Sequence, residues 1–279
     1  MTYSIVARDR DTGELGVGVQ SRAFNTGAVV PWARAGVGAV ATQAFGERRY
    51  GYRGLELMST GIPPADALAQ LRDADDRAEY RQVAMIDAAG TTAQHTGGAC
   101  IEAAGHTSGA GWAAQANMVD SQRVWESMGE AFESASGTLA RRLLAALDAA
   151  QAAGGDWRGM QAGGILVVPA EGEPWERVVD LRVDDSDAPL TELRRLLDAA
   201  EAYRAISAGE QNREHIARDG RLRELDVRWA AVFDTLAAGD VETARMLLAP
   251  LLAEEPRWAS YVRTLGELGR APGAEALLD

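Results

Sequence analysis

Alternating apolar and polar side chains open the chain, and this pattern predicts a half-buried strand from Thr2 to Arg8. The turn-forming segment DRDTGE and a second alternating run, LGVGVQ, come next, so we predict a β-hairpin. Six later segments also have strand character, the last two forming a second hairpin: AGVGAVATQA, RQVAMID, TTAQHTG, GWAAQANMV, GGILVVPA and WERVVDLRV.

Helical spacing fills two blocks between these strands. The first block contains GYRGLELMSTG and then PPADALAQLRDAD, which Pro63 and Pro64 open. The second runs from about Gln122 to Ala153 and is interrupted at Gly137. Hairpins of consecutive strands favour antiparallel sheets over a doubly wound parallel sheet. We therefore predict an α+β fold in which two sheets face each other and helices cover the outside.

The composition changes after the segment DDSDAP. Pro189 opens a helical pattern that places Leu193, Leu196 and Leu197 on one face, and no strand is predicted from there to the last residue. Within this tail, the segment from Ala237 to Arg270 resembles a tetratricopeptide-type helical hairpin. We predict two domains, residues 1–187 and a small all-α region at 188–279. A single repeat must bury its apolar face against neighbouring helices, the main domain or a second subunit.

Charge and composition exclude several classes of function. The 279 residues carry a formal net charge of −13, which repels nucleic acid and anionic membrane surfaces. No apolar stretch is long enough to cross a membrane, and Cys100 is the single cysteine, so we expect a cytoplasmic protein without disulfides. All 28 basic residues are arginine, which excludes a lysine base or Schiff base.

Signals for cofactors are weak. The segment GVGAVA, residues 36–41, fits a dinucleotide fingerprint, but its valines favour close packing of strands. His95, His106 and His215 have no metal-ligand spacing to one another. Cys100 has no basic neighbour and is expected to be a small buried side chain. We expect neither a metal nor an organic cofactor.

Three places carry candidate chemistry. Removal of the initiator methionine would make Thr2 the first residue, with its own amine beside its hydroxyl; the alternative is an ordinary first residue of a strand. Ser21 and Arg22 lie at the end of a predicted buried strand. They either form an ordinary polar loop or bind substrate, with the arginine contacting a carboxylate through two N–H groups. Three polar residues precede the strand that begins after residue 161: Asp156, Arg158 and Gln161. Asp156 and Arg158 either form an ion pair that caps a turn, or these residues take part in catalysis.

Several separated segments together resemble a bacterial family known as domain of unknown function 1028, assigned to the N-terminal-nucleophile (Ntn) hydrolase superfamily. They are residues 1–44, then YGYRGLELMSTG, GWAAQANMV, GDWRGMQAG and VVDLRVDD. The resemblance covers about two thirds of the chain. It implies a four-layer αββα sandwich of antiparallel sheets and cleavage of amide bonds by the first residue of the mature chain, here Thr2.

Hydrolysis by Thr2 would also need a base and further polar groups around it. Proteasome-like members of the superfamily use an acid and a lysine near the nucleophile, whereas this chain has Gln20 at the place of the acid and contains no lysine. The α-amine, with an ordinary pKa of about 7.7–8.0, would serve as the base. Further candidates, for the oxyanion and for orienting substrate, are Gln20, Ser21, Arg22, Thr42, Gln43, Gln115, Asn117, Asp156, Arg158 and Gln161.

The leading hypothesis is a hydrolase of small amides or peptides, including carboxylate-bearing ones, that uses Thr2. A second hypothesis is a binding or scaffold protein that keeps the sandwich without the activity and presents its helical tail to a partner or to a second copy. A third is a hydrolase whose nucleophile is Ser21, which would need a base beside it.

Overall fold

The computed structural model describes residues 2–207 and 224–278. The chain separates into two compact units, Met1–Leu197 and Asp198–Asp279. The candidate residue His215 lies outside the described residues. None of the helices within the two described stretches is both long and apolar enough to cross a membrane.

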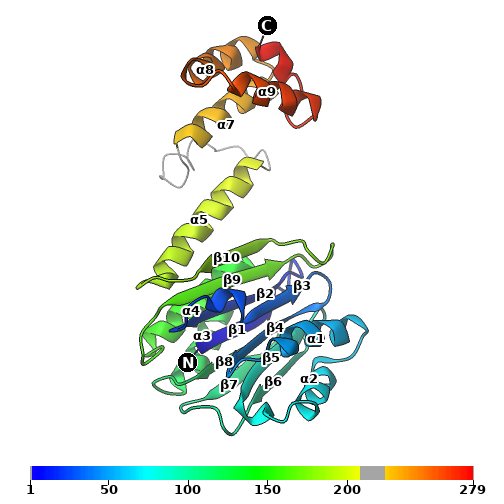
Figure 1. Cartoon of the computed structure of the whole chain (residues 1–279), viewed down its shortest axis with the longest axis vertical. Helices are drawn as coiled ribbons and strands as arrows, with labels where there is room; N and C mark the ends of the chain where they lie inside the picture. Colours follow the sequence, from blue (N-terminus) through cyan, green and yellow to red (C-terminus); the bar gives the residue numbers. More distant parts are fainter. Residues whose placement is uncertain (1, 208–223, 279) are drawn as a thin grey trace. The chain divides into compact units, whose positions relative to one another are not determined.

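Two antiparallel sheets make up the first unit (Figure 1). The larger has the order β10-β9-β2-β1-β8-β7, and the smaller has the order β3-β4-β5-β6. In chain order the strands are β1 (Thr2–Arg8), β2 (Leu15–Ser21), β3 (Pro31–Arg34), β4 (Gly38–Ala44), β5 (Arg81–Asp87), β6 (Thr92–Thr96), β7 (Gly105–Gly109), β8 (Trp112–Asn117), β9 (Ala162–Val168) and β10 (Val179–Val183). The predicted α+β class with antiparallel sheets is confirmed.

Helices pack on the outer face of each sheet (Figure 1). The helices α1 (Arg48–Ser59) and α2 (Pro64–Asp73) contact the smaller sheet, whereas α3 (Arg123–Ser134) and α4 (Leu139–Ala152) contact the larger one. The interruption predicted at Gly137 separates α3 from α4, and its φ of +98° explains why a glycine stands there. Two 3-10 turns, η1 (Thr26–Ala28) and η2 (Ala78–Tyr80), precede strands.

The period of two along each strand divides the first unit into apolar layers. In β1, Tyr3 and Ile5 face α3 and α4, while Val6 faces the smaller sheet together with Val17 and Val19 of β2. On the other side of the smaller sheet, the cluster that includes Val40, Val83 and Met85 packs against Tyr50, Leu55 and Met58 of α1. Both sheets are therefore covered on both faces.

Two strands do not follow the sequence prediction. The strand predicted at residues 35–44 begins later, as β4 at Gly38, after a turn with Gly36 at φ +68°; the preceding strand β3, which ends at Arg34, was not predicted. Strand β7, with the sequence GHTSG, was not predicted. It has two glycines and no large apolar residue, and it forms the edge of the larger sheet, where one neighbouring strand suffices to hold it.

Helices follow β10 throughout the part of the chain that the structure describes. They are α5 (Pro189–Ser207), α7 (Glu224–Ala237), α8 (Val241–Glu254), α9 (Trp258–Glu267) and the 3-10 turn η3 (Ala274–Leu277). Val232, Leu248, Leu251 and Val262 form the core of the second unit. The boundary between the units lies inside α5, because Leu190, Leu193 and Leu197 are buried in the core of the first unit.

This boundary leads to a prediction about truncated chains. A chain ending at residue 197 should unfold cooperatively, because it keeps all three apolar layers of the first unit. A chain ending at residue 187 should be less stable by several kcal/mol, because it lacks three buried leucines worth about 2 kcal/mol each. Thermal and urea unfolding of the two proteins provide the measurement. Equal stability of the two would show that the start of α5 does not belong to this core.

Candidate functional site

Strand ends from both sheets meet at the beginning of β1. Thr2 pairs with Ser21, the last residue of β2, and with Asn117, the last residue of β8. In the smaller sheet, Gln43 near the end of β4 pairs with Gln82 near the start of β5. The ends of five strands thus lie together at one edge of the unit, and we call it the Thr2 edge.

The space between the two sheets changes from apolar to polar along the strands. Its far part is packed by aliphatic side chains such as Val6, Val17 and Ile86. At the Thr2 edge, the same alternating positions carry polar side chains, each at most 7% exposed: Thr2, Ser4, Ser21, Gln43, Gln82, Gln115 and Asn117. A buried polar group without a hydrogen bond costs about 1–3 kcal/mol, so these side chains must bond to one another.

Thr2 is held through both its side chain and its carbonyl group. Its Oγ1 donates a hydrogen bond to Oγ of Ser21 at 3.0 Å. Its carbonyl oxygen accepts from Nε2 of Gln43 at 3.0 Å and makes a longer contact of 3.5 Å with Nδ2 of Asn117. The position of Thr2 is therefore fixed by two neighbouring strands and by the facing sheet.

Gln82 determines how these two amides are oriented. Its Nε2 faces three acceptors, the carbonyl oxygens of Ala116 at 2.8 Å and Gly105 at 3.1 Å and the hydroxyl of Thr96 at 3.0 Å. Its Oε1 accordingly accepts hydrogen bonds, from Nε2 of Gln43 at 2.7 Å and from Nδ2 of Asn117 at 2.9 Å. Both amides must then present their N–H groups, and not their oxygens, toward Thr2.

Ser4 and Gln115 extend the network toward the apolar part. The hydroxyl of Ser4 donates to Oε1 of Gln43 at 2.6 Å and accepts from Nε2 of Gln115 at 3.3 Å. Nε2 of Gln115 also reaches the carbonyl oxygen of Ala41 at 3.2 Å, whereas its Oε1 has no partner among the described residues. One buried acceptor is thus left over beside the Thr2 edge.

At its other end the network reaches the surface of the smaller sheet. The hydroxyl of Thr96, which accepts from Gln82, lies 2.8 Å from Nδ1 of His106. Burial, together with the charge of His95, lowers the pKa of His106. A neutral His106 ring accepts the Thr96 proton at Nδ1. Among residues 2–207 and 224–278, no cluster of His, Cys, Asp or Glu is suited to hold a metal ion.

A loop beside Ser21 is organised by Asp156, whose side chain is completely buried. One carboxylate oxygen accepts the N–H of Arg22 at 3.0 Å, and the other accepts the N–H of Arg158 at 2.8 Å. The guanidinium of Arg158 also reaches this carboxylate at 3.3 Å. Asp156 therefore holds the chain that leaves β2 immediately after Ser21.

Gln161 links the same loop to the Thr2 edge. Its N–H donates to the carbonyl oxygen of Ser21 at 3.2 Å, and its side-chain amide donates to Asp185 at 2.9 Å. Its Oε1 accepts from the guanidinium of Arg22. Because this partner is a neutral amide, the positive charge of Arg22 has no ion-pair partner among the described residues.

Two sequence candidates lie elsewhere. Gln20 pairs with Tyr3 and shares its face of the larger sheet, toward the helices, and neither atom of its amide has a partner among the described residues. Thr42 alternates with Gln43 and faces α1, where its hydroxyl donates to the carbonyl oxygen of Glu47 at 3.2 Å. Its N–H donates to the carbonyl oxygen of Val30 at 3.2 Å. Neither residue contacts the group around Thr2.

Tyr3 shows the same separation of faces. Its hydroxyl donates to Gln151 of α4 at 2.9 Å. Burial raises the pKa of Tyr3 well above its ordinary value, and the negative charges of Asp156 and Asp148 act in the same direction. Tyr3 therefore stays protonated and anchors β1 to the helices while Thr2, one residue earlier, faces the other sheet.

Sequence reasoning missed Ser4 and Gln82. A signal was available, because each is a polar residue at an inward position of a strand that also places apolar residues on that face, Val6 in β1 and Ala84 and Ile86 in β5. Period-two alternation also places Ser4 on the same face as Thr2, and Gln82 on the same face as Ala84 and Ile86 of the intersheet layer. What the sequence does not show is which strands of the two sheets face each other.

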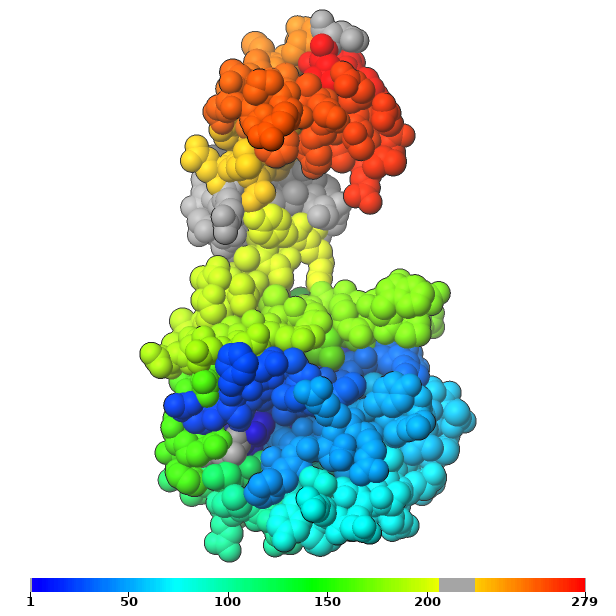
Figure 2. All heavy atoms as spheres, in the orientation of Figure 1, coloured from blue at the N-terminus to red at the C-terminus, as the bar shows by residue number. Residues whose placement is uncertain are grey.

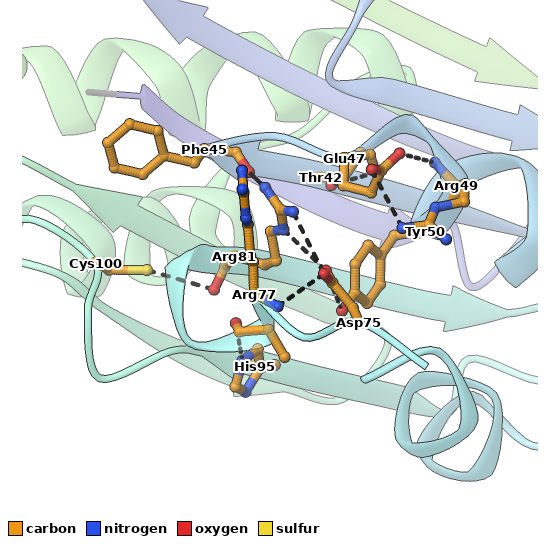
Figure 3. Close-up of polar contacts among 11 residues, drawn as sticks. Thr42, Phe45, Glu47, Arg49, Tyr50, Asp75, Arg77, Arg81, His95 and Cys100 are labelled. Atoms are coloured by element: carbon orange, nitrogen blue, oxygen red, sulfur yellow. Dashed lines mark hydrogen bonds and ion pairs between the residues drawn. The ribbon is translucent and has the colours of Figure 1, made fainter. Parts of the chain in front are cut away.

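An ion pair supports the edge of the smaller sheet (Figure 3). The buried Asp75 accepts hydrogen bonds from Arg81 at 2.9 Å, from the Arg77 N–H at 3.0 Å and from the Tyr50 hydroxyl at 3.2 Å. These bonds, that of Arg81 above all, lower the pKa of Asp75 to about 2, while burial and the Asp75 charge raise that of Tyr50 to about 12. Arg81 also donates to the carbonyl oxygen of Phe45 at 2.6 Å, just beyond β4.

Figure 2 shows the start of the chain, in dark blue, at the bottom of a hollow in the first unit. A separate cavity of about 520 Å³ lies between α1 and α2, and no residue of the Thr2 group lines it. The site is thus an edge where two sheets end, with a threonine at its base, buried amides beneath it and a charged loop beside it.

The protein is of the mixed α+β class, with two antiparallel sheets and helices on their outer faces. The chain belongs to a family of unknown function, DUF1028, whose model matches residues 2–193. A crystal structure of protein SPO2555 from Silicibacter pomeroyi, assigned to the same family, is similar with a TM-score of 0.66. The two are 32% identical over 71% of this chain and 88% of that one. No curated protein matches the chain.

The role of Gln82 can be measured as stability. Replacing Gln82 with leucine leaves three acceptors and two donors without their partner, so Gln82→Leu should lower the free energy of unfolding by about 3 kcal/mol. Gln94 is the matched control, since its Nε2 also bridges the sheets, to the carbonyl oxygens of Ala114 and Thr107. Gln94→Leu should lower it by only about 1 kcal/mol. Urea unfolding measures both, and equal losses would contradict the special role of Gln82.

The Asp75 ion pair predicts a pH dependence. A folded pKa of about 2, below the ordinary 3.8, means that ionised Asp75 stabilises the fold above pH 4 by about 2 kcal/mol. This contribution is lost as the pH falls from 4 to 2. Asp75→Asn should therefore be less stable than wild type at pH 7, and the difference should shrink by pH 2. Urea unfolding across this range is the measurement, and Glu130→Gln, at an exposed ion pair, should show a much smaller difference. A difference that is independent of pH would contradict the assignment.

Proposed function

We propose that the chain is a hydrolase of small amides or peptides, of the Ntn superfamily, whose nucleophile is Thr2 after removal of the initiator methionine. The order of layers supports the superfamily: α3 and α4, the larger sheet, the smaller sheet, then α1 and α2 correspond to an αββα sandwich. Thr2 begins a central strand of the larger sheet, as the proposal requires.

The observation that carries the proposal is the set of buried amides directed at Thr2. Aliphatic side chains fill the rest of the intersheet layer, and a fully apolar layer would be at least as stable as one that buries amides and hydroxyls. Polar groups at this edge are therefore explained better by a need to position Thr2 than by stability. The contacts of Gln43 and Ser21 with Thr2 supply that positioning.

The chemistry follows from the residue type. The neutral α-amine takes the hydroxyl proton of Thr2, directly or through a water, while Oγ1 attacks the carbonyl carbon of the substrate. The tetrahedral intermediate breaks its C–N bond as the leaving nitrogen receives that proton, and an ester remains on Oγ1. A water molecule then attacks the ester, with the amine again accepting a proton, and releases the acid.

Asn117 is our choice for the oxyanion. The N–H of Thr42 already donates to Val30, and both protons of Gln43 Nε2 have short acceptors. Asn117 uses one proton at 2.9 Å on Gln82, while the other makes only the long 3.5 Å contact with the Thr2 carbonyl oxygen. That second N–H is the least committed donor directed at Thr2, and it can turn to a developing oxyanion.

Arg22 and Arg158 differ as partners for a substrate carboxylate. The guanidinium of Arg158 contacts the buried Asp156, whereas that of Arg22 contacts a neutral amide. We therefore assign the binding of a carboxylate to Arg22, at the exit of β2, and a structural role to Asp156 and Arg158 in holding that loop.

Thr2 provides the direct test. Thr2→Ala should abolish amide hydrolysis and change the free energy of unfolding by about 1 kcal/mol or less, since a single hydrogen bond, to Ser21, is lost. Thr2→Ser keeps oxygen and amine and should retain part of the activity. Ser21→Ala should retain activity as well, which separates Thr2 from Ser21 as nucleophile. Initial rates on a panel of N-acyl amino acids and dipeptides are the measurement.

Intact-mass analysis supplies the control, because a retained initiator methionine blocks the amine. Full activity of protein that still carries Met1 would exclude Thr2, and so would equal activity of wild type and Thr2→Ala. If nothing in the panel is hydrolysed while the helical tail captures a protein partner, the scaffold hypothesis replaces the hydrolase. Exposed apolar side chains such as Met246 and Leu268 on that tail are the observation that favours it.

A further inference from the structure

Large apolar side chains are exposed beside the strand ends that meet at Thr2. Of the seven such side chains exposed within residues 2–197, five belong to segments that enter or leave strands at this edge. Their exposed fractions range from 45% to 67%: Phe24, Phe45, Tyr80, Ile101 and Trp157. Single exposed apolar residues are common, but a concentration at one edge marks a binding surface.

Chain position and backbone hydrogen bonds show where these five residues lie. Phe24 follows Ser21 by three residues, and Trp157 lies between Asp156 and Arg158 of the charged loop. The N–H of Phe45 donates to the carbonyl oxygen of Tyr80 at 3.3 Å.

Ile101 is placed by the next segment of the chain. Its carbonyl oxygen accepts from the N–H of Met118 at 3.1 Å, immediately after Asn117. In Figure 2 the segments that surround the hollow come from these separate parts of the chain.

The pair Phe45 and Tyr80 is rigidly supported. Their rings are in edge-to-face contact with centroids 5.9 Å apart. The guanidinium of Arg81 holds the carbonyl oxygen of Phe45, and Asp75 in turn holds Arg81 (Figure 3). Aromatic side chains fixed in this way offer apolar surface without having to be ordered when a ligand binds.

The order of strands gives the surface a direction. Thr2 lies on β1 between β2, whose end carries Arg22, and β8, whose end contacts Ile101. Phe45 directly follows β4 and Tyr80 directly precedes β5, both in the facing sheet. A substrate whose carboxylate binds Arg22 therefore extends past Thr2 toward Phe45, Tyr80 and Ile101 on the other side.

We propose that the substrate is an N-acyl amino acid with a large apolar acyl group, which Phe45, Tyr80 and Ile101 bind while Arg22 binds the carboxylate. This inference rests on the proposed function and names its substrate class. The amide carbonyl of such a molecule lies between the two recognised ends, at Thr2. A short acyl group would leave the aromatic surface exposed to water and forgo its contribution to binding.

The experiment compares N-octanoylglycine with N-acetylglycine, which share the amide and the carboxylate. Binding to the Thr2→Ala protein is measured by calorimetry, and turnover by wild type is measured separately. The octanoyl compound should bind at least ~10-fold more tightly, because several methylene groups leave water. Phe45→Ala and Tyr80→Ala should bring the ratio of the two affinities close to one, while Arg22→Gln should weaken both ligands equally.

Trp175→Ala is the matched control. Trp175 is 71% exposed but lies between β9 and β10, at the opposite end of these strands, so its loss should leave the ratio unchanged. The proposed substrate class would be overturned if the ratio of the two affinities were the same in the Thr2→Ala protein with and without Phe45→Ala, or if neither ligand bound. Selective binding of the octanoyl compound without turnover would support the apolar surface and contradict the hydrolase. Turnover of both compounds without selectivity would support the hydrolase and contradict the role of the apolar surface.

Discussion

The hydrogen bonds of Gln82 are the constraint on which the candidate site depends. A side-chain amide has one acceptor and one donor group, and the three acceptors around its Nε2 allow only one orientation. That orientation forces Gln43 and Asn117 to present N–H groups to the Thr2 carbonyl. The direction of both side-chain amides beside Thr2 therefore follows from Gln82. In a buried layer with little water, no alternative partner is available to relax this arrangement.

Period-two alternation explains which candidates act together. Thr2, Ser21, Gln43 and Asn117 occupy inward positions, so that two sheets folded face to face bring them into contact although 115 residues separate Thr2 from Asn117 along the chain. Gln20 and Thr42 are each one residue away from an inward position, and they face helices instead. Neighbours in sequence are thus separated by the thickness of a sheet, whereas distant residues share the site.

Local patterns were sufficient to predict most of the elements but not the site. The hairpins and the helices on both sides of Gly137 have clear periodicity, whereas GHTSG is too polar and too rich in glycine to be recognised as strand β7. An ion pair of Asp156 and Arg158 was one of the two alternatives considered for these residues, but the bond from Asp156 to the Arg22 backbone depends on how the sheet closes. Ser4 and Gln82 escaped notice because their importance lies in contacts between sheets, which no local pattern encodes.

In the proposed hydrolase, the buried amides next to Thr2 and the exposed apolar side chains at the Thr2 edge serve complementary purposes. Amide hydrolysis develops charge on an oxygen, and oriented N–H dipoles stabilise that charge more strongly where water is excluded. Buried amides alone cannot exclude water from an open edge, whereas the exposed rings of Phe45 and Tyr80 can do so once an apolar group covers them. If the chain is the proposed hydrolase, a substrate that covers these rings also lowers the dielectric constant around Thr2, so that recognition of the acyl group and stabilisation of the transition state become parts of the same binding event.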